Sequence, residues 1–161
     1  MTFADPQDHV KQAERNNRTI KERVRATFWR LPFESLPKIL IRKLVQQVTQ
    51  KINYVCPKGG ASKECSPNDI MMHERLDYNR HFNVPLGSPA EAYNRGFPCN
   101  QLPERAIAGI CVGPAKNFQE GHGIYDIKTK AIITRCKMTQ IPLTPATIET
   151  VEQHAHEDGM R

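Results

Sequence analysis

The chain has 161 residues, with 23 Lys and Arg against 17 Asp and Glu, which gives a formal net charge of +6. This length allows one domain or two small ones but not several, and the positive balance favours polyanionic partners without requiring them. Five cysteines at irregular spacing argue against a disulfide scaffold. No apolar run approaches the roughly 18 residues of a membrane span, and the polar N-terminus does not resemble a signal peptide. We therefore expect an intracellular protein without membrane contact, for which the nucleus is one compatible compartment.

Two amphipathic helices are predicted in the first third of the chain. The first runs from about Asp5 to Phe28, with Val10, Ala13, Ile20, Val24 and Phe28 on one apolar stripe. The second runs from Ser35, a candidate N-cap, to about Val55. Its predicted buried face is formed by Ile39, Leu40, Leu44, Val45, Val48, Ile52 and Val55. Nothing else nearby in the sequence can cover both faces, so we expect this pair to belong to a larger layer.

The remaining two thirds divide into three parts. Residues 58–104, rich in Gly, Pro, Ser and Asn, are predicted to be a linker with one short helix that Ser66 caps and Pro67 begins. The stretches RAIAGICVG, HGIYDI and KAIITRC predict three strands within 105–143, with a hairpin turn at DIKTK. Residues 144–161 are predicted to form a short helix, capped by Thr144, and a frayed tail that holds His154 and His156.

The first helix carries an excess of positive charge, in the stretch HVKQAERNNRTIKERVRA. At about 100° per residue, Glu14, Arg18, Lys21 and Arg25 lie within roughly 60° of one another, beside the apolar stripe. Such a face can hold a nucleic-acid backbone, and a carboxylate at its edge can contribute to a Mg²⁺ site. The alternative is a solvated face on which Glu14 pairs with Arg18.

The stretch AERNNRTIKERVRA resembles the helix that carries the last acidic residue of the retroviral and retrotransposon integrase core. The segments LPKILIRKLVQQVTQKIN, PKGGASKECSPNDIMMHERLDYNRH and GICVGPAKNFQEGHGIYDIKTKAIITRCKMTQIP are similar, in the same order, to those that follow it in copia-type retrotransposon polyproteins. The similarity covers about residues 9–143. It implies an α+β chain in which residues 1–57 are the last helices of a ribonuclease-H-like core and residues 105–143 are a small antiparallel β-barrel.

The resemblance implies DNA integration by metal-dependent phosphoryl transfer in the intact parent. Glu14 matches the third carboxylate of an Asp, Asp, Glu site that binds Mg²⁺ or Mn²⁺. Arg18 and Lys21 match positions where integrases carry basic residues that contact DNA, and Arg25 extends that face by geometry. The two aspartates belong on strands well upstream of Glu14, and the Asn-Gly pair that often precedes the motif is absent. One carboxylate cannot assemble a two-metal site, so we expect neither strand transfer nor tight metal binding from this polypeptide alone.

Three smaller groups carry further expectations. Lys128 and Lys130 on the predicted hairpin are candidates for DNA contact, and equally for ordinary protection of a sheet edge. Trp29 is expected to pack within the helix pair, together with Phe28 and Phe33, rather than to stack on bases. Cys111 and Cys136 lie in strand patterns, where buried and inert thiols are usual.

We therefore expect a fragment of an integrase that retains at most nucleic-acid binding, with DNA as its partner. An alternative is a protein–protein interaction module, in which the helix pair packs on a second copy or on the missing part of the core. A third is a relic without function, whose helices lack the sheet they once covered.

Overall fold

The computed structural model describes residues 11–58, 62–73, 75, 77–78, 84–94, 104–115 and 121–160. Within these residues the chain is mixed α+β, with four helices and one five-stranded antiparallel sheet. The helices are α1 (Lys11–Phe28), α2 (Lys38–Asn53), α3 (Pro67–Met72) and α5 (Pro145–Glu157). The strands are β1 (Pro89–Tyr93), β2 (Ala106–Pro114), β3 (His122–Asp126), β4 (Ile132–Arg135) and β5 (Met138–Gln140). No helix in the described part is both long and apolar enough to cross a bilayer.

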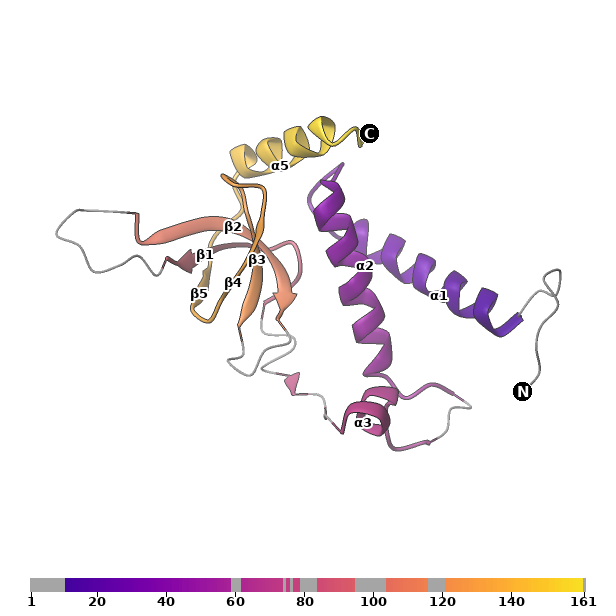
Figure 1. The fold of residues 1–161 in the computed structure, drawn as a ribbon. Helices are drawn as coiled ribbons and strands as arrows, with labels where there is room; N and C mark the ends of the chain where they lie inside the picture. The colour runs from indigo at the N-terminus through magenta and orange to yellow at the C-terminus, as the bar shows by residue number, and fades with distance from the viewer. Residues whose placement is uncertain are drawn as a thin grey trace.

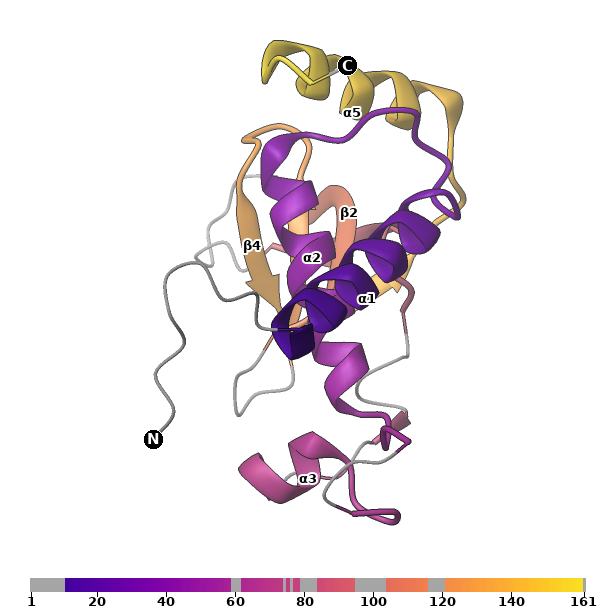
Figure 2. The ribbon, with the colours of Figure 1, turned by 90° about the vertical axis from the view of Figure 1, so that its right-hand side faces the viewer.

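The molecule is layered, with α2 between the sheet and α1 (Figure 1). In the view turned by 90°, α1 crosses the outer side of α2, and α5 lies at the end of the molecule opposite α3 (Figure 2). This arrangement leaves α1 supported on one side only. Its partly buried residues are Ile20, Val24, Thr27 and Phe28, and every other described side chain of α1 is exposed. The predicted burial of Ala13 is therefore wrong. The part of the predicted helix before Lys11, which includes Val10, lies outside the described residues.

The second helix begins at Lys38 instead of Ser35. Pro37 has extended backbone angles, with φ −57° and ψ 147°, so the helical path starts only after it. Ser35 is buried and does not cap the helix. The N–H of Lys38 donates instead to Oδ2 of Asp158 at 2.9 Å. A carboxylate just beyond α5 thus supplies the cap that we assigned to a local serine.

The apolar face of α2 is covered by the chain itself. Leu40, Leu44 and Val48 are buried, whereas Val45 and Val55 are exposed, contrary to prediction. Val55 lies beyond the last helical residue, and Val45 lies on the side away from the buried residues. Cys111 is fully buried, as predicted, and Cys136 is exposed, which was not predicted.

Five strands form the sheet, in the order β4-β3-β2-β1-β5. Two of them were not predicted: β1 lies within the stretch that we interpreted as linker, and β5 has only three residues. The outer strands β4 and β5 are joined by only Cys136 and Lys137. Four strand spacings of about 4.8 Å would separate them by roughly 19 Å in a flat sheet, and a two-residue link reaches only about 11 Å. The sheet must therefore curl strongly, as in a small barrel.

One hydrophobic core joins the helices to the sheet. Its buried members are Phe33, Leu36 and Leu40 near α2, Ile110 and Val112 of β2, Tyr125 of β3, and Val151 of α5. The predicted frayed tail is wrong, because α5 continues to Glu157 and its Val151, His154 and Ala155 are buried. The N–H of Glu34 also donates to Oε1 of Glu152 at 2.8 Å, so α5 is anchored to the segment that leads into α2.

Candidate nucleic-acid interface

Four charged residues, Glu14, Arg18, Lys21 and Arg25, lie along one side of α1, and all four are exposed. We call Arg18, Lys21 and Arg25 the basic stripe. The stripe adjoins the partly buried side of the helix, as the sequence predicted. With a rise of 1.5 Å per residue, the distance along the helix from Arg18 to Arg25 is about 10 Å. This length matches the spacing of several phosphates along one nucleic-acid strand.

The stripe is only partly neutralised by acidic neighbours. Nε of Arg18 lies 2.9 Å from Oε1 of Glu22, and this hydrogen bond, together with the Glu22 charge, raises the pKa of Arg18. Both side chains are largely exposed, so the pair contributes little to stability. Within the described part of the chain, neither Lys21 nor Arg25 forms an ion pair with a carboxylate. These two cations are the strongest candidates for phosphate contacts.

Glu14 lies in the first turn of α1, where the positive end of the helix dipole favours a carboxylate. A magnesium site needs oxygen ligands from several chain segments. Among the described residues, no three His, Cys, Asp or Glu side chains lie close enough together to hold a metal ion. The assignment of Glu14 as a metal ligand remains a prediction from the resemblance.

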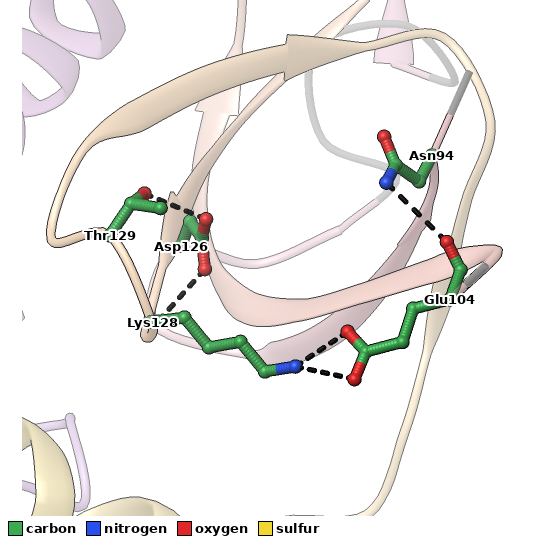
Figure 3. Close-up of polar contacts among 5 residues, drawn as sticks. All are labelled: Asn94, Glu104, Asp126, Lys128 and Thr129. Atoms are coloured by element: carbon green, nitrogen blue, oxygen red, sulfur yellow. Dashed lines mark hydrogen bonds and ion pairs between the residues drawn. The ribbon is translucent and has the colours of Figure 1, made fainter. Parts of the chain in front are cut away.

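The two hairpin lysines each have an acidic partner. Nζ of Lys128 lies 2.7 Å from Oε1 and 2.5 Å from Oε2 of Glu104, as Figure 3 shows. Nζ of Lys130 forms an ion pair with Glu157 of α5. The hydrogen bond and charge of Lys130 lower the pKa of Glu157. These partners are 24 and 27 residues away in the sequence, so the sequence alone gave no sign of them. Any phosphate that contacts these lysines has to compete with a carboxylate.

Asp126 holds the hairpin that carries both lysines. Its Oδ1 accepts a hydrogen bond from the N–H of Lys128 at 2.9 Å, and its Oδ2 accepts one from the hydroxyl of Thr129 at 2.7 Å (Figure 3). Lys130 completes the turn in the left-handed region, with φ 57°. The predicted hairpin at DIKTK is therefore confirmed, and Lys128 has a defined backbone position.

Sequence reasoning missed the exposure of Trp29. Phe33 is buried and Phe28 is partly buried, as predicted, but Trp29 is 81% exposed. The chain turns at Trp29 and Arg30 and then directs Leu31 and Phe33 toward the core. The spacing of apolar residues in the sequence does not show which of these three aromatic side chains the turn leaves exposed to solvent.

Comparison with protein-family models, curated proteins and solved structures found no match.

Proposed function

We propose that this chain is part of a copia-type integrase and binds nucleic acid through the basic stripe of α1. The proposed lineage rests on the ordered sequence similarity over about residues 9–143. The proposed binding rests on one structural observation, the exposed and incompletely neutralised stripe on α1, whose other side packs on α2. DNA integration is proposed for the intact parent, and backbone binding for this chain.

The physical argument is electrostatic. A Lys or Arg that contacts a phosphate releases condensed counterions, so each contact adds affinity that falls as the salt concentration rises. Lys21 and Arg25 lie about one helical turn apart on the same side of α1, which lets both reach the same strand. The net charge of +6 adds a long-range attraction for polyanions.

The structure removes one reason for the alternative of a protein interaction module. It was suggested by an apolar face of α2 that a two-helix fragment could not cover, yet that face packs within the chain's own core. Self-association, or docking on the rest of an integrase core, would instead have to use other surfaces. Sedimentation of the full chain at low and high salt distinguishes a monomer that binds DNA from a salt-independent oligomer.

Two matched substitutions on α1 test the proposal. Arg25 belongs to the stripe, and Arg23 lies roughly on the opposite side of the same helix, also exposed. We expect Arg25→Ala to weaken binding to a duplex and to reduce the salt slope by about 0.9, as expected for one lost phosphate contact. Arg23→Ala removes the same charge and should change the slope much less. Equal effects of the two variants would mean that only net charge matters, and the stripe would not be the binding site.

A further inference from the structure

Trp29 continues the basic stripe at the C-terminal end of α1. It is the single tryptophan of the chain and is 81% exposed. The backbone N–H of Trp29 donates to the backbone carbonyl of Arg25 at 3.0 Å, so the helical hydrogen-bond pattern extends one residue beyond Phe28. At about 100° per residue, this continuation places Trp29 within roughly 40° of Arg25 around the helix axis. An aromatic ring and the stripe cations therefore share one side of α1.

The Trp29 ring contacts the neighbouring Phe28 ring and is otherwise largely exposed. The rings of Phe28 and Trp29 meet edge-to-face, with centroids 5.8 Å apart and an interplanar angle of 76°. Phe28 in turn packs against the hydrophobic core. Burying an aromatic side chain of this size would be strongly favourable. In this fold the Trp29 ring instead stays exposed to solvent, next to Phe28, which is anchored in the core.

Cationic residues lie close to Trp29 along the chain. Arg25 precedes it by one helical turn, and Arg30 follows it in the chain and is exposed. Burial, and next the charge of the Arg30 guanidinium, lower the pKa of Lys51 on α2. Surfaces that bind single strands combine cations for the phosphates with aromatic rings on which bases stack. Duplex bases are already stacked on one another and offer no free face.

We propose that Trp29 stacks on an unpaired base of a single-stranded nucleic acid whose phosphates contact Arg25 and Lys21. This inference rests on the proposed nucleic-acid binding and makes it more specific, because it identifies single strands as the preferred form. The cations serve both single strands and duplex, whereas the ring serves single strands alone. Stacking tolerates any base, so DNA and RNA of matched length should both engage it.

Tryptophan fluorescence of the full chain, excited at wavelengths that tyrosine does not absorb, reports on this site alone, because Trp29 is the single tryptophan. Twelve-nucleotide oligo(dT) and oligo(U) are titrated against a 12-base-pair duplex, with affinities measured by anisotropy of labelled strands. We expect both single strands to quench Trp29. Trp29→Ala should weaken single-strand binding by about 5- to 150-fold and change duplex binding less than twofold, while Trp29→Phe retains part of the affinity. Tyr93→Ala, which removes another exposed aromatic side chain, is the matched control and should change neither.

The outcomes separate this inference from the binding on which it rests. If the wild-type chain binds single strands and Arg25→Ala weakens them but Trp29→Ala does not, the stacking is overturned and the stripe stands. Equal losses for duplex and single strands on Trp29→Ala also overturn the stacking, because a structural role would act on both. If the wild-type chain binds neither form, the proposed function and this inference fall together.

Discussion

The phenolic oxygen of Tyr125 lies 3.0 Å from Nδ1 of His154, and this hydrogen bond joins β3 to α5. Both residues are buried, with Tyr125 1% and His154 8% exposed. Their rings meet edge-to-face, with centroids 6.2 Å apart. Asp158, which caps α2, directly follows α5, so this bond lies where the sheet, α5 and the start of α2 meet.

Removing that hydroxyl should destabilise the fold measurably. Tyr125→Phe keeps the ring in the core but leaves Nδ1 of His154 buried without this partner, which should lower the free energy of unfolding by about 1–3 kcal/mol. Urea denaturation followed by circular dichroism measures the change. Tyr93→Phe, at an exposed position, is the control and should stay within about 0.5 kcal/mol of wild type. Equal stability of the two variants would show that the buried bond contributes nothing.

The alkaline limit of stability follows from Tyr125. Burial, and next the charges of Asp158, Glu157 and Asp126, raise its pKa to about 12. In the unfolded chain a tyrosine ionises near 10. Its stabilisation is therefore complete below about pH 10 and is lost as the pH rises through 12, which amounts to at most about 3 kcal/mol. When urea midpoints are measured between pH 8 and pH 12, they should decrease above about pH 10. The fall should be smaller in Tyr125→Phe, and an identical fall would contradict the assignment.

At low pH, His122 should decrease the stability of the fold. Burial lowers the pKa of His122, whose Nε2 is buried without a hydrogen-bond partner among the described residues. The folded chain therefore favours the neutral imidazole of His122. The resulting stabilisation is complete above about pH 6.5 and is lost as the pH falls below that value. His122→Gln should flatten the decline between pH 7 and pH 5 in urea midpoints. A decline as steep as that of wild type would exclude His122 as its source.

Gly113 tests the contact between β2 and α2. It has φ +103°, and a Cβ added there would lie 2.6 Å from Cδ of the buried Gln47 side chain. Gly113→Ala combines backbone strain with a displacement of the buried amide end of Gln47, so it should cost more than Gly159→Ala. Gly159, with φ +74° and nothing within 4 Å of the added Cβ, isolates the backbone term. Gly159→Ala should cost about 1 kcal/mol. Similar losses for both would mean that the amide end of Gln47 moves aside at little cost.

The ion pair between Lys128 and Glu104 makes a prediction for the hairpin. Because the carboxylate neutralises the ammonium group, Lys128→Ala should reduce DNA affinity less than Arg25→Ala does. Glu104→Gln should tighten binding about twofold or more if Lys128 faces DNA, since it removes the competing carboxylate. Glu91→Gln, at an exposed position on β1, controls for the change in net charge. An equal gain from Glu91→Gln would remove the hairpin from the interface.

Local signals in the sequence predicted local structure well. Ser66 accepts a hydrogen bond from the N–H of Asp69 and so begins α3, and Thr144 caps α5 in the same way. The hairpin after Asp126 is likewise set by residues within five positions. Each of these features depends on side chains that the sequence places next to one another.

Features that depend on distant partners were not predictable in this way. The sequence PAEAY of β1 lacks β-branched residues, and its strand conformation comes from antiparallel pairing with β2 and β5. The cap of α2 comes from Asp158, 120 residues away, so the local candidate Ser35 was misassigned. The face of the basic stripe followed from helical geometry alone, whereas the exposure of Trp29 depends on how the next turn directs Leu31 and Phe33 into the core.

The most direct measurement is the salt dependence of DNA binding by the full chain. The dissociation constant for a 20-base-pair duplex is determined by anisotropy between 50 and 200 mM salt. Two or three phosphate contacts by the basic stripe predict a slope of log affinity against log salt between about −1.8 and −2.7. No binding at 50 mM salt, or a slope near zero, would contradict the proposal that α1 binds a nucleic-acid backbone.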